Sequence, residues 1–277
     1  MPGWEPLLSG MPVTESCGRQ LEAMVTRGCA ASQAVPGRVD LWELVLDASP
    51  EVARGSEAWL SAEEHDRSAR FASPAQRMEY NVTHALLRSV LGAYDGRPPQ
   101  CLRFTAGAHG KPRLLGSNGR PSPIEFNLSH SAGRAMVAVS IGAELGLDLE
   151  RETTQVDPWD LARRFFHPAE ASVIEAAPSS RQAALFLRYW VSKEAVLKAA
   201  GSGLQGTLDS FRMEFGEDGR RAAAVFDDGS AGPETWTVKL PSVAPGWHVA
   251  VCVRGSNWAI RPAAAVKLGR QVEHRDD

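Results

Sequence analysis

The sequence predicts an α+β protein made of two similar halves. Short strand-like runs and longer helix-like segments alternate along its 277 residues, and the order of strand, helices and strands occurs twice. With 43% hydrophobic residues, the chain is long enough to bury a substantial core. We expect the two halves to meet near residues 141 to 146, and a gene duplication would account for the repeated order.

The first half begins with a predicted strand over VDLWELVLD (39–47). A helix is expected over 61–71, because Ser61 can cap its N-terminus and acidic residues fill its first turn. Pro74 starts a second helix, which carries an apolar stripe at helical spacing and ends near Gly92. Further strands are expected over CLRFTA (101–106), PIEFNLSHS (123–131), RAMVAVSIG (134–142) and LGLDLE (145–150).

The second half begins with a helical stretch over 157–166, which His167 and Pro168 interrupt. A long helix follows over 179–201, with Ser180 as its N-cap and Gly201 as the left-handed residue that ends it. The chain then alternates between turns and strands, which are predicted over 210–215, 221–226, 234–240 and 246–254.

These elements divide the chain into four parts. They are a partly ordered N-terminal extension (1–36), an N-terminal α+β half (37–143), a C-terminal α+β half (144–256) and a C-terminal tail (257–277).

Composition excludes several classes of function. A net charge of -3 argues against a nucleic-acid partner, and the apolar runs are shorter than the ~18 residues of a membrane span. The N-terminus lacks the basic start and apolar stretch of a signal peptide, and the four cysteines are scattered. We therefore expect a cytoplasmic protein with reduced thiols.

Two carboxylates lie two residues apart on one predicted strand. In GLDLE, Asp148 and Glu150 project from the same face because side chains alternate along a strand, while Leu147 and Leu149 point to the other face. Two such carboxylates repel each other unless a cation or a shared proton lies between them. A solvated strand face is the alternative interpretation.

The long helix supplies a third carboxylate. Glu194 and Lys198 are four residues apart and share one helix face, where an ordinary ion pair is the alternative. Trp190, one turn earlier, is equally compatible with a core position. Because this helix and the strand are expected to meet where the halves join, the carboxylates would form an oxygen-rich site of the kind that suits Mg²⁺ and phosphate.

Three further residues are candidates for binding phosphate. Lys111 in HGKP lies in a turn-like context, and Ser129 and His130 lie near a strand end. A hydrogen-bonded structural histidine is the alternative for His130. A Ser–His nucleophilic pair is not expected, because adjacent strand residues point to opposite faces. The glycines of GSGLQG (201–206) follow a helix rather than a strand, so they indicate a helix end and turn instead of a dinucleotide site.

The order and spacing of these motifs resemble a known family. FNLSHS, GLDLE and the W-x-x-K-E-x-x-x-K of Trp190, Lys193, Glu194 and Lys198 closely resemble the motifs of the Sfp-type 4′-phosphopantetheinyl transferases. HGKP, RFFHPAE, GSGL and PGWHVAVC resemble further segments of that family, so the resemblance covers about residues 39 to 254.

The resemblance implies two α+β subdomains related by a pseudo-twofold axis, in a monomer that binds coenzyme A between them. It implies that Asp148, Glu150 and Glu194 bind Mg²⁺ and that Lys198 contacts phosphate. The residues that would hold the nucleotide end of coenzyme A are Lys111, Ser129, His130 (near the 3′-phosphate) and Arg67.

The resemblance also implies a reaction. A carrier-protein serine attacks the β-phosphate of coenzyme A and displaces 3′,5′-ADP, with Glu194 or a metal-bound water accepting the serine proton. The expected partners are acyl, peptidyl or aryl carrier protein domains. We expect their acidic helix to meet a basic or apolar patch near Arg163, Arg164 and residues 165–175.

Two positions depart from the family pattern. Glu64 stands beside Arg67 where the family often has a basic pair, and Glu79 lies near another expected basic residue. Either a register shift lets Arg67, Arg70 or Arg77 compensate, or coenzyme A binding is altered. The second functional hypothesis is therefore a non-catalytic homologue that binds coenzyme A or carrier proteins; a Mg²⁺-dependent phosphohydrolase is the third.

Overall fold

The computed structural model describes residues 35–46, 50–107, 110–153, 157–201, 207–226, 236–262 and 266–267. It confirms the α+β class. The described residues form two compact units. The helical unit comprises those of Leu44–Leu102 and 266–267, and the sheet unit comprises residues 35–43 and those of Arg103–Ala263. The proposed division into duplicated halves, 37–143 and 144–256, concerns a repeated order of elements and stays a prediction.

The helical unit begins with α2 (Pro50–Glu57), a helix that the sequence analysis did not predict. The next helix, α3 (Ala62–Ala69), confirms Ser61 as its N-cap. The Ser61 hydroxyl accepts a hydrogen bond from the Glu64 N–H, and the Glu64 carboxylate accepts one from the Ser61 N–H. This capping box pairs two N–H groups that the first helical turn would otherwise leave unpaired.

The following helix, α4 (Pro74–Asp95), is one turn longer than expected. It ends at Gly96, whose φ of 78° places it in the left-handed region, so the predicted end near Gly92 is wrong. Gly92 is needed for a different reason, because a Cβ atom there would lie 2.6 Å from the backbone oxygen of Arg97. After α4 come a short 3₁₀ helix, η2 (Pro99–Cys101), and the end of this unit.

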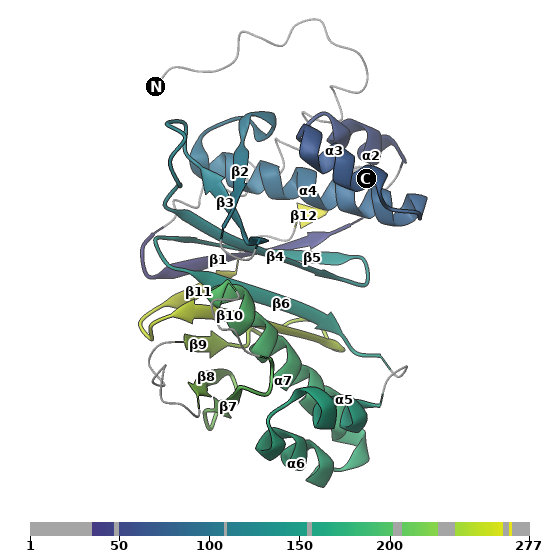
Figure 1. Ribbon diagram of the computed structural model, residues 1–277, viewed down its shortest axis with the longest axis vertical. Coiled ribbons are helices and arrows are strands. Elements are labelled where there is room, and N and C mark those ends of the chain that lie inside the picture. The colour runs from purple at the N-terminus through teal and green to yellow at the C-terminus, as the bar shows by residue number, and fades with distance from the viewer. Residues whose placement is uncertain are drawn as a thin grey trace, which may run out of the picture. The chain divides into compact units, whose positions relative to one another are not determined.

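Two sheets and a hairpin make up the strands (Figure 1). The first sheet has the order β11-β1-β5-β4, and β12 pairs with the end of β1. The second has the order β6-β10-β9-β8-β7. The bounds in the first sheet are β1 (Arg38–Val45), β4 (Ile124–Ser131), β5 (Arg134–Ile141), β11 (Ala259–Pro262) and β12 (Val266–Lys267). Those in the second are β6 (Leu145–Arg151), β7 (Phe211–Phe215), β8 (Arg221–Phe226), β9 (Trp236–Lys239) and β10 (Trp247–Arg254).

Some strands differ from the prediction. The hairpin of β2 (Arg103–Ala106) and β3 (Pro112–Leu115) contains one expected and one unexpected strand. Both β11 and β12 lie within the segment that the sequence analysis assigned to a C-terminal tail, and they pair in parallel with β1. Such long-range parallel pairing has no local sequence signal.

Three helices belong to the sheet unit: α5 (Pro158–Phe165), α6 (Pro168–Ala176) and α7 (Ser179–Ala200). The interruption at His167 is confirmed, although Pro168 starts the unpredicted α6. Ser180 is not the N-cap of α7, because the helix already includes Ser179 and begins after Pro178 without a side-chain cap. Gly201, with a φ of 60°, ends α7 as expected; the rest of GSGLQG lies outside the described residues.

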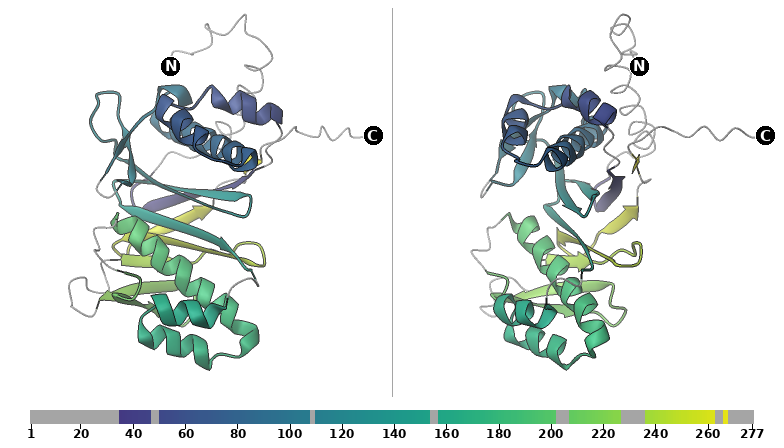
Figure 2. Two further views of the ribbon diagram at one scale, coloured as in Figure 1. Left: turned by 45° about the vertical axis from the view of Figure 1, so that its right-hand side comes forward. Right: turned by 90° about the vertical axis from the view of Figure 1, so that its right-hand side faces the viewer.

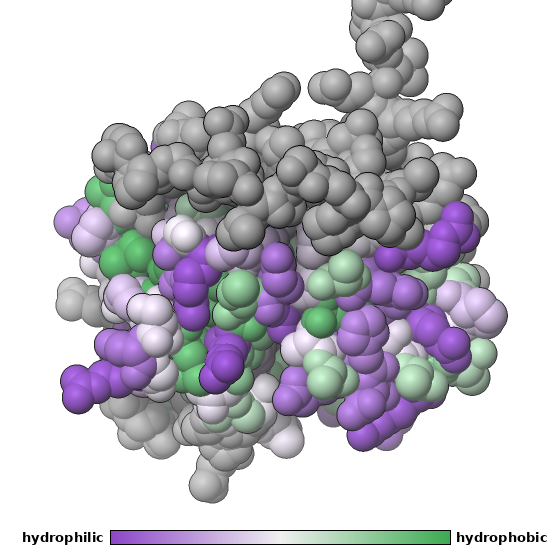
Figure 3. Space-filling model, turned by 90° about the horizontal axis from the view of Figure 1, so that it is seen from above, coloured by the Kyte–Doolittle hydropathy of each residue, from purple (hydrophilic) through white to green (hydrophobic). Residues whose placement is uncertain are grey.

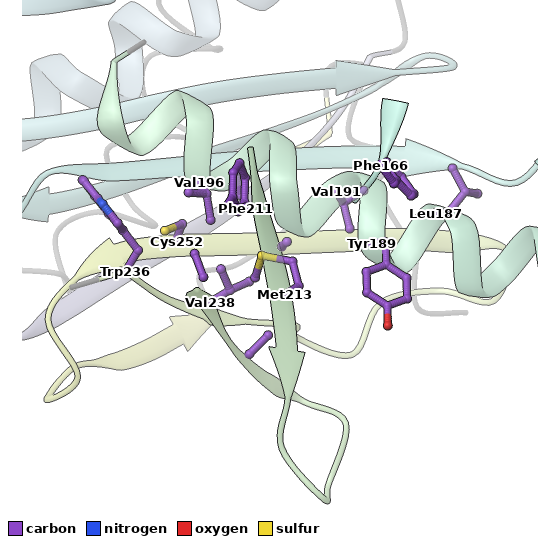
Figure 4. Close-up of a cluster of buried hydrophobic side chains, with 14 of the residues drawn as sticks. Phe166, Leu187, Tyr189, Val191, Val196, Phe211, Met213, Trp236, Val238 and Cys252 are labelled. Carbon is purple, nitrogen blue, oxygen red and sulfur yellow. The ribbon is translucent and has the colours of Figure 1, made fainter. Parts of the chain in front are cut away.

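Helix α7 packs along β6 and β10, and both views of Figure 2 show it beside them. Its buried residues join a hydrophobic cluster that includes Val196, Phe211, Val238 and Cys252 (Figure 4). On the other face of β6, Leu145, Leu147 and Leu149 join a second cluster, which confirms the predicted inward leucines. Burial of this apolar surface holds helix and strand together.

The described surface carries few large apolar side chains. Among the described residues, Val35 and Val173 are the large hydrophobic residues that stand exposed. Figure 3 shows one face, where hydrophilic side chains in purple are interspersed with smaller hydrophobic areas in green. A search of the described helices found none with the length and apolar character to cross a membrane.

Candidate active site

Polar side chains on alternate positions of β4 connect it to β6. Asn127 accepts a hydrogen bond from the Leu147 N–H at 2.9 Å, and the Ser129 hydroxyl accepts one from the Leu149 N–H at 3.2 Å. The Ser131 hydroxyl donates to the Glu150 carboxylate at 2.9 Å. Because residues two apart share a strand face, these three side chains all reach β6 and hold the GLDLE segment in register.

Asp148 is the most tightly held of the three predicted metal carboxylates. It is only 3% exposed, and its Oδ1 lies 2.5 Å from Lys198 Nζ and 3.0 Å from the Ser129 hydroxyl. Its Oδ2 is buried and has no hydrogen-bond partner among the described residues. A buried carboxylate oxygen without a partner is costly unless a ligand satisfies it, so this atom is a candidate position for a ligand.

Glu150 and Glu194 lie near this aspartate, on β6 and α7. Burial, and after it the negative charge of Asp148, raises the pKa of the Glu194 carboxyl above its usual range. The pKa of Glu150 is also raised, chiefly by burial and further by Asp148, although the Ser131 hydrogen bond opposes the change. The three carboxylates therefore repel one another's charged forms, which a nearby cation would relieve.

Lys198 is one such cation. It is four residues after Glu194 on α7, and its ammonium group acts against the raised pKa of both glutamates. As the side chains stand, the described residues contain no group of three or more metal-binding side chains in coordinating positions. The structure thus brings the predicted acidic residues into one neighbourhood, with Lys198 neutralising Asp148.

Lys111 is held by backbone carbonyl groups. Its Nζ donates to Leu145 O at 2.8 Å and to Ala199 O at 3.2 Å, so it joins the start of β6 to the end of α7. Burial lowers the pKa of this lysine. An ammonium group has three N–H donors, so two carbonyl bonds leave one for a ligand.

Ser129 and His130 face in different directions, as alternation along β4 predicts. Ser129 is buried beside Asp148, whereas His130 is exposed. The hydroxyl of Ser129 is engaged by Asp148 and by the Leu149 N–H, so in this structure it positions the acidic residue. Sequence reasoning missed Asn127 and Ser131 as its companions, although polar residues at every second position of FNLSHS carried the signal.

Arg67 belongs to the helical unit and is exposed near the end of α3. It lines an open hollow together with Glu63, Arg70 and Phe71. Its guanidinium also lies 5.9 Å from the ring centre of Tyr80. The hollow is thus lined by two positively charged side chains and one negatively charged one.

Glu64, the unexpected acidic residue, has a structural role. Besides capping α3, it accepts a hydrogen bond at 2.7 Å from Arg88, which is 1% exposed, and contacts His84. Burial acts to raise the pKa of Glu64, but the His84 contact, the Ser61 N–H and Arg88 outweigh it and lower the pKa overall. The reversed charge is thus neutralised inside the helical unit, and Arg67 and Arg70 remain at its surface.

A second lysine of α7, Lys193, is fully buried and pairs with Glu170 of α6 at 2.9 Å. Lys193 also donates to the carbonyl groups of Leu208 and Phe211. Glu170 in turn accepts hydrogen bonds from the N–H groups of Met213 and His167. The lysine that the motif analysis grouped with Glu194 therefore ties together α6, α7 and the start of β7.

Comparison with known proteins identifies relatives that are named as 4′-phosphopantetheinyl transferases. Residues 144–252 match the model of the 4′-phosphopantetheinyl transferase superfamily. The chain is 38% identical over 166 residues to 4′-phosphopantetheinyl transferase HetI of Nostoc sp. (strain PCC 7120), covering 60% of this chain and 70% of that protein. It is 30% identical over 205 residues to 4′-phosphopantetheinyl transferase Sfp of Bacillus subtilis (strain 168), covering 70% and 87%. These matches confirm the resemblance inferred from the motifs.

Proposed function

Because this chain belongs to the 4′-phosphopantetheinyl transferase superfamily, we propose that it transfers the 4′-phosphopantetheine arm of coenzyme A to a serine of a carrier protein. The reaction releases 3′,5′-ADP. The observation that carries this proposal for the chain's own residues is Asp148, whose Oδ2 is buried and unpartnered beside Lys198 and two further carboxylates.

Asp148, Glu150 and Glu194 are the residues that would hold Mg²⁺. The donor set fits this ion, since Mg²⁺ prefers carboxylate oxygens and completes its shell with water and phosphate oxygens. The unpartnered Asp148 oxygen and the raised pKa values of both glutamates support the assignment. When bound, Mg²⁺ neutralises the negative charge that grows on the pyrophosphate during transfer.

Lys198 and Glu194 are the proposed catalytic residues. Lys198 lies next to Asp148 with a side chain 31% exposed, which leaves its ammonium group able to reach a phosphate oxygen. Glu194 or a metal-bound water would accept the proton of the carrier serine.

The nucleotide end of coenzyme A requires cationic and polar groups. We assign it to Lys111, through its remaining N–H, to Ser129 and His130, and to Arg67 with Arg70 beside it. Because Glu64 is neutralised by Arg88, it does not argue for lost coenzyme A binding. The non-catalytic alternative thereby loses one of the two residues that favoured it, and Glu79 is the other.

The partners are acyl, peptidyl or aryl carrier protein domains, with a docking surface that includes Arg163 and Arg164. Both arginines are exposed on α5, and the Arg164 guanidinium lies 5.1 Å from the ring centre of Phe165. Val173 of α6 is also exposed. Arginines next to apolar side chains suit an acidic carrier helix. We also propose that the chain is a monomer, as the family resemblance implies, and that it is cytoplasmic, as expected from its scattered cysteines.

The deciding experiment incubates the chain with coenzyme A and several apo carrier proteins, with and without Mg²⁺. Mass spectrometry of the carrier is expected to show the added phosphopantetheine arm only with Mg²⁺, together with release of 3′,5′-ADP. Binding of coenzyme A and carrier without any mass gain would favour the non-catalytic alternative instead. Cleavage of coenzyme A without a carrier would favour a phosphohydrolase.

A further inference from the structure

The backbones of β6 and α7 approach unusually closely at Gly146. A Cβ atom at this position would overlap the carbonyl oxygen of Ala195 and the amide nitrogen of Ala199, and would lie 3.0 Å from the carbonyl carbon of Lys198. All three are backbone atoms, which cannot move aside as a flexible side chain can. Any residue other than glycine would therefore force the helix away from the strand.

The close approach occurs beside the acidic site. Gly146, Asp148 and Glu150 share the face of β6 that lies toward α7, since the intervening leucines fill the opposite hydrophobic cluster. The helix residues that Gly146 approaches are Ala195, which directly follows Glu194, and Lys198 with Ala199. The spacing at Gly146 thus sets how closely the strand carboxylates approach the helix side chains.

Lys111 reinforces the same junction. Its two acceptors are Leu145 O, adjacent to Gly146 on the strand, and Ala199 O, on one of the helix residues that a Cβ atom would strike. One ammonium group therefore ties the two backbones together where the glycine lets them touch. On the opposite face of β6, Leu145, Leu147 and Leu149 pack into a buried hydrophobic cluster, so the strand has little freedom to move away from the helix.

We propose that Gly146 is a positioning residue: its missing side chain holds β6 against α7 at the distance that brings Asp148 to Lys198 and beside Glu194. This proposal rests on the proposed function for its catalytic meaning. The geometry of Gly146 does not require a left-handed backbone, because its φ lies outside the positive region that favours glycine. Space, and not backbone freedom, is the reason for the glycine.

The test is Gly146→Ala, read in three ways. In the transfer assay we expect kcat to fall at least about 30-fold while KM for the carrier changes less than about threefold. Calorimetric titration with Mg²⁺ alone is expected to show an apparent Kd raised about tenfold, as when the support of a metal ligand is lost.

The third measurement needs neither metal nor substrate. A double-mutant cycle of Asp148→Asn and Lys198→Met measures the coupling between these side chains in urea unfolding. With Gly146 present, we expect the interaction between the two side chains to change the unfolding constant by a factor of about ten. In the Gly146→Ala background, we expect this interaction to have almost no effect on the unfolding constant.

Two glycines provide matched controls. Gly92→Ala meets a backbone oxygen at 2.6 Å in the helical unit, so it destabilises the chain without touching the site. Gly216→Ala meets no atom closer than 3.7 Å and tests the substitution itself. Neither control is expected to shift the Mg²⁺ Kd or the Asp148–Lys198 coupling.

An unchanged coupling and Mg²⁺ Kd in Gly146→Ala would overturn the positioning role, even if stability fell. If the native chain shows no transfer, the proposed function fails, while the coupling and the Mg²⁺ titration still decide the role of Gly146. If Gly146→Ala does not fold, Lys111→Met loosens the same junction without adding atoms. In the Lys111→Met background, the coupling between Asp148 and Lys198 is then expected to fall by at least half. An unchanged coupling would overturn the proposal.

Discussion

Helix α7 makes two lysine–carboxylate pairs, and they differ in how completely their hydrogen bonds are satisfied. Lys193 and Glu170 are both buried, and N–H groups and carbonyls surround the pair. Lys198 and Asp148 are closer together, yet Lys198 is partly exposed and Asp148 keeps a buried oxygen that has no partner among the described residues. The saturated pair can only hold structure, whereas the unsaturated pair has capacity left for a ligand.

Residues in one sequence motif therefore have separate tasks. Lys193 and Glu194 are adjacent, but the helix turns them toward different neighbours: Lys193 toward α6 and β7, Glu194 toward the β6 carboxylates. A motif match alone does not distinguish a ligand-binding residue from one that fastens the element carrying it.

The largest expected effect is a loss of stability when the fully hydrogen-bonded pair of Lys193 and Glu170 is broken. Lys193→Met leaves Glu170 charged and unpaired in the core, so we expect the free energy of unfolding to fall by about 3–5 kcal/mol in urea titrations. Adding Glu170→Gln is expected to recover part of this loss. A loss below about 1 kcal/mol would contradict the structural reading of the pair.

Breaking the pair of Asp148 and Lys198 is expected to lower the transfer rate more than the stability. Asp148→Asn keeps the shape of the side chain but removes its charge, and we expect the transfer rate to fall about 10²–10³-fold. The free energy of unfolding is expected to fall by about 1–2 kcal/mol, less than for Lys193→Met, because Lys198 can turn toward water. The matched control is Glu214→Gln, an exposed residue of β7, which should alter neither quantity. A comparable loss of stability in Asp148→Asn would remove the contrast with Lys193.

A third pair, Glu64 and Arg88 of the helical unit, gives a pH test. The pKa of Glu64 is lowered in the folded chain, so its charge contributes stability above the ordinary value of 4.5, and this contribution is lost as the pH falls through the lowered value. We expect Glu64→Gln to cost about 2 kcal/mol at pH 7, and the difference from the native chain to shrink below about pH 4.5. Urea titrations across this range measure it, and a difference independent of pH would show that the charge of Glu64 is not responsible.

The smallest expected effect is that of Ser131→Ala. The substitution removes the 2.9 Å hydrogen bond to Glu150, and we expect a change of about 0.5–1.5 kcal/mol, seen as a threefold to tenfold lower kcat/KM. Ser117→Ala, at an exposed turn position after β3, serves as the control. Activity equal to the native chain would mean that Glu150 needs no support from β4.

Local signals predicted much of the fold. The cap at Ser61, the interruption at His167, the end of α7 at Gly201 and the leucine face of β6 all depend on neighbours within a few residues. The end of α4 was misplaced because two glycines lie one turn apart. Only the packing against Arg97 distinguishes Gly92, which permits contact, from Gly96, which ends the helix.

The candidate site also combines features that the sequence predicted with features that depend on tertiary contacts. The motif order identified Asp148, Glu150, Glu194 and Lys198, and the structure brings them into one neighbourhood. The motif order did not reveal that Ser129 supports Asp148, that Glu64 is neutralised by Arg88, or that Lys111 binds two carbonyl groups. Each of those facts joins residues that are distant in the chain.

By itself, the sequence determined the α+β class, the family and the acidic residues, because periodicity, caps and motif spacing are properties of neighbouring positions. Only the tertiary structure decided which charge is satisfied and which is left open. Two lysines five positions apart on one helix meet different partners, and a glycine without a side chain sets how near the strand lies. Burial and hydrogen-bond saturation depend on what the fold brings alongside each group, and no local pattern encodes it.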